Sequence, residues 1–129
     1  MTKIDLPKSF ERARLAVTPV LSAASGGLEN ELRRVVEYHW GWVDPNGLPT
    51  GDRPGKALRP TLALLSAEAV GAEAEIALAG AAAVELVHDF TLLHDDVMDD
   101  DRERRGRPAA WTCFGVGAAI CAGDALMLL

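Results

Sequence analysis

Three aspartates at a fixed spacing are the residues of this sequence best suited to take part in chemistry. Asp95, Asp96 and Asp99 stand in the order DDVMD at the end of a long apolar segment. In a helix, residues four apart lie on one face with a rise of about 6 Å, so Asp95 and Asp99 would present two carboxylates side by side. Mg²⁺ compensates such like charges well, because it prefers carboxylate oxygens and completes its shell with water and substrate phosphates. Taken alone, the pattern also fits a solvated acidic helix end, as Asp100 and Asp101 do.

The residues that follow supply positive charge next to these carboxylates. The segment Arg104-Arg105-Gly106-Arg107-Pro108 begins five residues after Asp99. Paired guanidinium groups can grip diphosphate oxygens bidentately, and a turn at 106–108 would fold them back towards the aspartates. The alternative is that surface arginines only neutralise the acidic cluster, which explains their charge but not the fixed spacing.

A second group of residues suited to an anion lies upstream. Lys56 and Arg59 stand three residues apart in Gly55-Lys-Ala-Leu-Arg-Pro60, at a junction between a loop and a helix where backbone N–H groups are free to face an anion. His88 precedes Asp95 by two helical turns and so lies on nearly the same face, about 10 Å away along the axis. His88 and His94 are also compatible with ordinary core histidines.

Composition limits what these residues can belong to. The 129 residues are 49% hydrophobic and carry a formal charge of −6, which allows one small core and argues against a nucleic-acid partner. No Lys or Arg occurs between Arg59 and Arg102, although this stretch holds ten acidic residues. Cys113 and Cys121 suit core positions in a reducing, cytoplasmic setting. No uncharged stretch reaches the ~20 residues of a membrane span, and the first residues do not form a signal peptide.

The elements that must position these side chains are predicted to be helices throughout. Ala and Leu dominate, and the apolar spacing is helical with no competing strand pattern, so the fold class is all-α. Helices are expected at about 7–21, 28–40, 60–71 and 72–100, and from 108 to the end of the sequence. Residues 41–55 are expected to form a loop because Pro and Gly recur there.

The ordered set of motifs resembles the conserved blocks of the trans-isoprenyl diphosphate synthases, the polyprenyl synthetase family. The blocks are GKxxRP, ExxH, HDDVMD, RRGRP and GDAL, and they run from about residue 55 to residue 129. The resemblance implies a helical bundle of the isoprenoid synthase type with only its first half present, so that residues 1–129 are the N-terminal part of one domain. It further implies a Mg²⁺-dependent prenyltransferase of isoprenoid biosynthesis, which joins an allylic diphosphate to isopentenyl diphosphate as a homodimer.

The same resemblance assigns roles to individual residues. Asp95, Asp96 and Asp99 would hold Mg²⁺ that bridges to the allylic diphosphate, which Arg104 would also bind.

Isopentenyl diphosphate would be bound by Lys56, Arg59, His88 and Arg105. Phe90, at the fifth position before the first aspartate, and Thr91, one turn before it, would limit product length, as in synthases of geranylgeranyl or farnesyl diphosphate. For Phe90 the alternative is an ordinary core residue.

Two departures from the family pattern qualify this assignment. Family members often read GGKRxRP, whereas Pro54 and Ala57 stand here in place of Gly and Arg; the binding residues Lys56 and Arg59 are intact. The family's second aspartate-rich motif lies beyond the last residue of this sequence, so the fragment alone is expected to be inactive.

Other function classes are compatible with parts of the pattern. A class I terpene cyclase also uses DDxxD, but it needs no second diphosphate site. A non-catalytic partner subunit of a full-length synthase would be expected to lose the metal carboxylates, and all three are present here. A helical scaffold with an acidic end is the remaining alternative.

Overall fold

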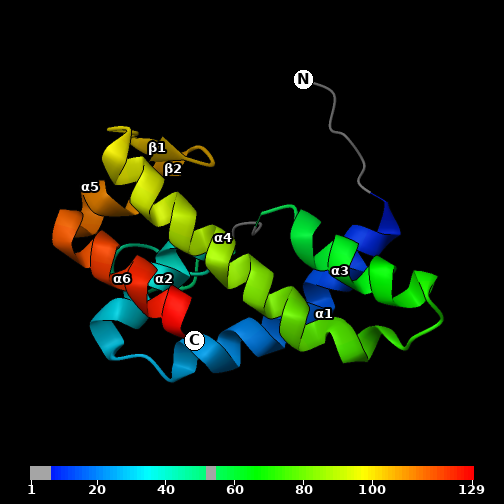
Figure 1. The fold of residues 1–129 in the computed structure, drawn as a ribbon. Helices are drawn as coiled ribbons and strands as arrows, with labels where there is room; N and C mark the ends of the chain where they lie inside the picture. The colour runs from blue at the N-terminus through cyan, green and yellow to red at the C-terminus, as the bar shows by residue number, and fades with distance from the viewer. Residues whose placement is uncertain (1–6, 52–54) are drawn as a thin grey trace. The chain divides into compact units, whose positions relative to one another are not determined.

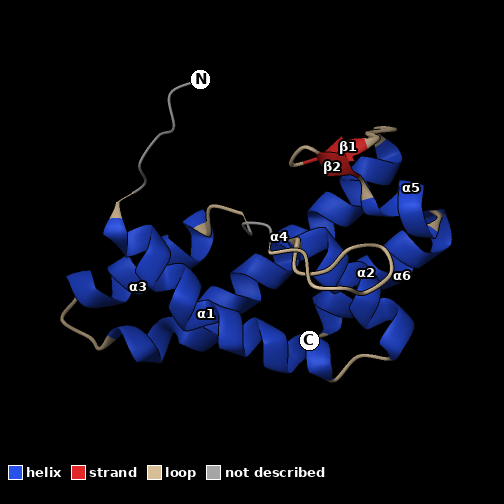
Figure 2. Ribbon diagram, turned by 180° about the vertical axis from the view of Figure 1, so that it is seen from behind, coloured by secondary structure: helices blue, strands red, loops and turns tan. Residues whose placement is uncertain are grey.

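The computed structural model describes residues 7–51 and 55–129, and most of this part of the chain is helical (Figures 1 and 2). The elements in chain order are α1 (Lys8–Gly26), α2 (Asn30–Trp40), α3 (Leu58–Ala69), the short 3-10 helix η1 (Ala74–Ala77), α4 (Leu78–Met98), β1 (Glu103–Arg104), β2 (Arg107–Pro108), α5 (Ala110–Phe114) and α6 (Val116–Leu128). The all-α prediction is therefore confirmed, with one short hairpin added.

The described chain divides into two compact units, whose boundaries fall within α1, between Gly55 and Lys56, and within α4. The first contains the residues up to Ser22 together with Lys56–Glu85, and the second contains Ala23–Gly55 and Leu86–Leu129. The expectation that the whole chain is part of one domain stays a prediction.

In the first unit, α1 buries a stripe of apolar side chains. Ala13, Val17 and Leu21 recur every four residues and are at most 6% exposed, as one face of a core helix requires. From α3, Leu64 and Thr61 are buried, and α3 packs against η1. This unit carries the junction between the predicted loop and α3.

In the second unit, α2, α5 and α6 pack against one another and enclose small and aromatic side chains. Val36 and Tyr38 of α2 are buried, as are Ala119, Ala122 and Leu126 of α6. The small residues of α6 allow close approach between helices. This unit carries the acidic end of α4 and the hairpin.

Left-handed residues end three of the helices. Gly41 after α2 and Gly71 after α3 have φ of 83° and 80°, and Asp100 after α4 has φ of 55°. In each case the next residue donates its N–H to a carbonyl five residues back, which is the Schellman arrangement. The predicted end of the third helix near Gly71 is confirmed.

Some predicted helix limits were wrong. The first helix continues beyond Leu21 to Gly26, and the third begins at Leu58, so that Pro60 lies in its first turn, where its missing N–H costs little. The last predicted helix is two helices, because Gly115 has φ of 91° between α5 and α6.

The expectation of no strand was wrong at the RRGRP segment. Glu103 pairs with Pro108 and Arg104 with Arg107, around a turn in which Arg105 and Gly106 both have positive φ. Two positive φ values define the type I′ turn that suits hairpins. Strands of two residues are too short to produce an alternating pattern, so the sequence could not indicate them. Figure 1 shows this hairpin beside the C-terminal end of α4.

Two expectations about apolar residues have different outcomes. Cys113 and Cys121 are exposed, so their assignment to the core was wrong. The stretch Ala74–Met98 is long and apolar enough to cross a membrane by length and composition, with a mean hydropathy of 1.6, and 28% of that window is buried. A core helix of a soluble protein passes the same test, so the prediction of no membrane span stays a prediction.

Candidate functional site

The three predicted metal ligands differ in their surroundings at the end of α4. The Asp99 N–H donates to the Asp95 carbonyl at 2.8 Å, which continues the helical pattern and places the two residues one turn apart. Asp95 is half-buried and Asp99 is exposed, whereas Asp96 is 1% exposed. The carboxylates of Asp95 and Asp99 are therefore accessible to a ligand, and Asp96 points into the protein.

Arg104 pairs with the buried Asp96 and fixes the hairpin to α4. Its Nε lies 3.1 and 3.3 Å from the two carboxylate oxygens of Asp96, and its Nη2 donates to Oδ1 of the same group. The Asp96 bond is the largest cause of a raised pKa of Arg104; burial opposes it, and the charges of Asp101 and Asp95 act with it. Arg104 thus remains cationic next to the aspartates, as we predicted from the RRGRP segment.

Arg105 lies beside a second buried carboxylate that the sequence did not single out. Its Nη2 is 3.7 Å from Oδ1 of Asp89, whose side chain is 2% exposed. The Asp89 oxygens also lie 3.2 Å from Nε2 of His39 and 2.8 Å from Nε1 of Trp40, which donates its indole N–H.

Asp89 is held in its ionised form despite its burial. Desolvation by burial would raise the pKa of this carboxyl, but the hydrogen bond from His39, the charge of Arg105 and the bond from Trp40 hold the pKa below its ordinary value of 3.8. Sequence reasoning missed the cluster because its members are about 50 residues apart. The local signal was limited to an Asp within a largely apolar helix.

Arg107 and Tyr38 fasten the other strand of the hairpin to α2. Arg107 Nη2 donates to the Tyr38 carbonyl at 2.9 Å, and its guanidinium carbon lies 4.9 Å from the Tyr38 ring centre. The Tyr38 hydroxyl in turn donates to the Pro108 carbonyl at 2.7 Å. Burial, followed by the contact with Cys113, raises the pKa of Tyr38 to about 12, so the hydroxyl stays a donor.

Two glycines lie directly against the arginines of the hairpin. A Cβ atom at Gly41 would be 3.1 Å from Nη2 of Arg107, and one at Gly55 would be 3.1 Å from Cζ and Nη2 of Arg105. Gly55 is the first residue of the GKxxRP motif. Its contact with Arg105 explains why a residue without a side chain stands there, which the motif alone did not indicate.

The upstream residues Lys56 and Arg59 lie at the expected junction. Ala57 precedes α3 in a left-handed conformation, with φ of 53°, and Lys56 and Arg59 are both exposed on either side of it. They belong to the first unit, whereas His88 and Arg105 belong to the second. A joint diphosphate site formed by these four residues therefore stays a prediction. Pro54, the departure from the family pattern, lies outside the described residues.

Phe90, Thr91 and His88 are half-buried on α4. The Thr91 hydroxyl donates to the His88 carbonyl at 2.7 Å, a local bond within the helix. The Phe90 ring meets the His94 ring edge to face at 4.7 Å between centres. The predicted role of Phe90 and Thr91 in product length stays a prediction.

His94 fits closely against α6. Its Nε2 lies 3.0 Å from the Ile120 carbonyl, and a Cβ at Gly123 would come within 2.5 Å of its ring. Gly123, the first residue of the GDAL block, is thus required by packing, and the core alternative for His94 matches its contacts.

The described residues contain no group of three His, Cys, Asp or Glu side chains arranged to hold a metal ion. Mg²⁺ nevertheless needs only one or two protein carboxylates when phosphates and water complete its shell. The accessible pair Asp95 and Asp99 fits that donor set. Asp96 is less accessible, because it is 1% exposed and bonded to Arg104.

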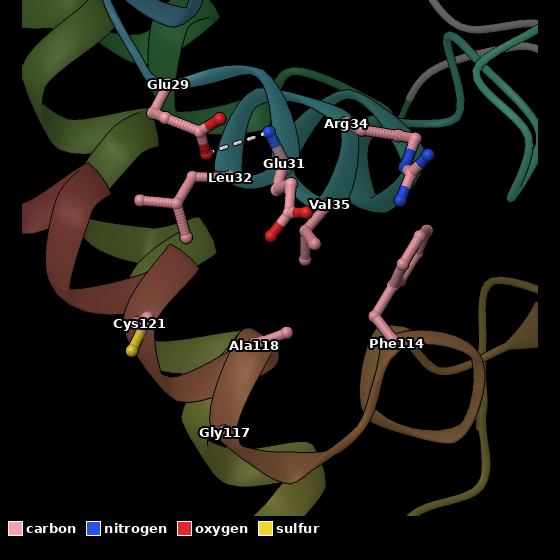
Figure 3. A pocket seen from close by; sticks show the side chains of 9 residues that line it. All are labelled: Glu29, Glu31, Leu32, Arg34, Val35, Phe114, Gly117, Ala118 and Cys121. Carbon is pink, nitrogen blue, oxygen red and sulfur yellow. Dashed lines mark hydrogen bonds between the residues drawn. The ribbon is translucent and has the colours of Figure 1, made fainter.

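A pocket of about 320 Å³ lies elsewhere in the second unit, where α2 faces α5 and α6 (Figure 3). Arg34 and Phe114 stand at one end, with the guanidinium carbon 5.8 Å from the ring centre, and Cys121 stands at the other. Glu29 at the rim accepts from the Glu31 N–H at 2.9 Å. None of the predicted site residues lines this pocket.

Comparisons with known proteins identify the family of the chain. The model of the polyprenyl synthetase family matches residues 49–129, and the chain belongs to this family.

Among individual proteins, the (2E,6E)-farnesyl diphosphate synthase of Mycobacterium tuberculosis is 45% identical over all 129 residues, and the geranylgeranyl diphosphate synthase of the same organism is 46% identical over 123 residues. A polyprenyl synthetase structure from Streptomyces coelicolor A3(2) matches 96% of this chain with 49% identity and a TM-score of 0.90. The chain spans 36%, 35% and 37% of the lengths of these three proteins.

Proposed function

We propose that the complete protein containing this segment is a trans-prenyltransferase that condenses an allylic diphosphate with isopentenyl diphosphate. The observation that carries the proposal is the hairpin bond from Arg104 to Asp96, which keeps a cation beside two accessible carboxylates, Asp95 and Asp99. The names of the relatives support the same reaction class.

Asp95 and Asp99 are our candidates for direct Mg²⁺ ligands, with Asp96 as the third residue of the motif. Mg²⁺ bound there would supply positive charge next to the allylic diphosphate. Asp96 acts through Arg104: it occupies Nε and one N–H of Nη2, and leaves the other donors of the guanidinium for diphosphate oxygens.

Catalysis of this kind is electrostatic. Fixed guanidinium groups stabilise negative charge as it develops on the leaving diphosphate, and they need little reorganisation because the protein already holds them. Arg104 would bind the allylic diphosphate, while Arg105, Lys56, Arg59 and His88 would bind isopentenyl diphosphate. None of these roles needs a nucleophilic side chain.

Product length would be limited along α4, where Phe90 and Thr91 precede the acidic motif. We include homodimerisation and membership of a single synthase domain in the proposal because of the family resemblance, and a cytoplasmic location because of the low cysteine content. The 129 residues alone would be inactive, because that resemblance places a second aspartate-rich motif beyond them.

The test uses a complete synthase that carries this segment. Asp95→Ala should lower Mg²⁺-dependent turnover by about 10²-fold or more while the helical circular dichroism spectrum survives. The matched control is Asp100→Asn, which removes an exposed carboxylate at a left-handed position that Asn tolerates. Unchanged turnover of Asp95→Ala would refute the site.

The division between the two diphosphates has its own test. Lys56→Ala, Arg59→Ala and His88→Ala should mainly raise the KM for isopentenyl diphosphate. A rise confined to the KM for the allylic substrate would show that the two sites are assigned the wrong way round.

A further inference from the structure

Asp89, His39 and Trp40 have no part in the function proposed so far. Asp89 is buried in the second unit, on the face of α4 that meets His39 and Trp40 of α2. A buried carboxylate is costly unless it is paired, so one held by two side-chain donors and a nearby guanidinium calls for a role. Among the described residues, Arg105 has the only Lys or Arg side chain within ion-pair distance of Asp89.

The two arginines of the hairpin relate to their carboxylates in different ways. Arg104 donates directly to Asp96 through Nε and Nη2, so part of its donor set is occupied. Arg105 stands 3.7 Å from Asp89, which is too far for a hydrogen bond but close enough for charge attraction. Asp89 therefore attracts the guanidinium of Arg105 without accepting a hydrogen bond from Nη2.

Arg105 is confined from another side as well. The missing side chain of Gly55 leaves space for its guanidinium, which would lie only 3.1 to 3.4 Å from a Cβ atom there. The residue is also the first central residue of the type I′ turn, with φ of 56°. Its side chain is still 31% exposed, so a ligand can reach it.

We propose that Asp89, which is held by His39 and Trp40, is a positioning residue for Arg105. Together with Gly55, which has no side chain, it orients the Arg105 guanidinium towards the diphosphate of isopentenyl diphosphate. The inference rests on the proposed function. It adds that the affinity of one substrate depends on a buried carboxylate that never touches it.

The main variant is Asp89→Asn, which keeps the shape and one acceptor oxygen but removes the charge. In the complete synthase, the KM for isopentenyl diphosphate should rise about tenfold. This is less than the roughly hundredfold loss of rate that a 1 Å misplacement of a reacting group can cause. The kcat and the KM for the allylic diphosphate should change by less than about twofold. Calorimetric titration with isopentenyl diphosphate should show the same loss of affinity. Glu103→Gln removes one exposed carboxylate from the same hairpin and serves as the matched control.

A double-variant comparison separates positioning from a purely structural effect. In an Arg105→Gln background, Asp89→Asn should add less than about twofold to the KM, because its effect passes through Arg105. An equal effect in both backgrounds, or an unchanged KM in a folded Asp89→Asn enzyme, would overturn the inference.

Gly55→Ala keeps the inference testable if Asp89→Asn does not fold. The new Cβ meets only the flexible end of Arg105, so the protein should fold and show a raised KM for isopentenyl diphosphate alone. An unchanged KM for isopentenyl diphosphate in Gly55→Ala would overturn the role of Gly55. If Asp89→Asn also fails to fold, the same result would overturn the whole inference. Absence of condensation by the unmodified synthase would instead refute the proposed function.

Discussion

Replacing Arg104 by Gln tests whether the pair with Asp96 holds the hairpin to α4. The substitution keeps a polar side chain but removes the charge, so the Asp96 carboxylate, only 2% exposed, loses its partner. Breaking a buried ion pair from one side costs about 3–5 kcal/mol. Because the Arg104 side chain is 28% exposed, water screens part of the loss, and we expect a cost of about 2–3 kcal/mol.

The assay is a double-mutant cycle in a complete synthase, with the free energy of unfolding measured in urea for Arg104→Gln, Asp96→Asn and the double variant. Asp96→Asn alone should cost about 1–3 kcal/mol, since the Arg104 donors lose a charged acceptor. The double variant should cost clearly less than the sum, with a coupling of at least about 1.5 kcal/mol. A coupling below about 0.5 kcal/mol, as for an exposed pair, would refute the reasoning.

Three further predictions concern packing, product length and assembly. Gly123→Ala should destabilise the fold by about 1–3 kcal/mol in thermal melts, because its Cβ would lie 2.5 Å from the ring of His94. Gly117 lies in the same helix, and a Cβ there would meet no atom within 4 Å, so Gly117→Ala should be neutral or slightly stabilising. Equal melting temperatures for the two variants would contradict the packing argument. Phe90→Ala should shift the products towards longer chains, and an unaltered product distribution would show that Phe90 does not limit product length. The isolated 129 residues should dimerise or aggregate in light scattering and lack condensation activity with geranyl and isopentenyl diphosphates, because apolar residues such as Met127 and Leu128 are 61% and 87% exposed; a well-behaved monomer or measurable product would contradict this.

The sequence alone was sufficient for the features that depend on neighbouring residues. Apolar spacing and Ala and Leu content indicated the helices, and Gly71 indicated the end of α3. The order of the motifs indicated the family. The sequence also indicated a turn that folds Arg104 back towards the aspartates, although this turn is centred on Arg105 and Gly106 and not on residues 106–108. These signals are local because helix formation and tight turns are governed by contacts within a few residues.

Only the tertiary structure decided how the charged side chains are paired. DDVMD does not reveal that Asp96 turns inwards to Arg104 while Asp95 and Asp99 remain accessible, because that depends on where the hairpin packs. Nor could any motif connect His39 with Asp89, since the two are 50 residues apart in the chain and meet only when α2 packs beside α4. Burial and the partners that packing brings together set the strength of an ion pair and the protonation of a carboxyl, and both are properties of the packed chain.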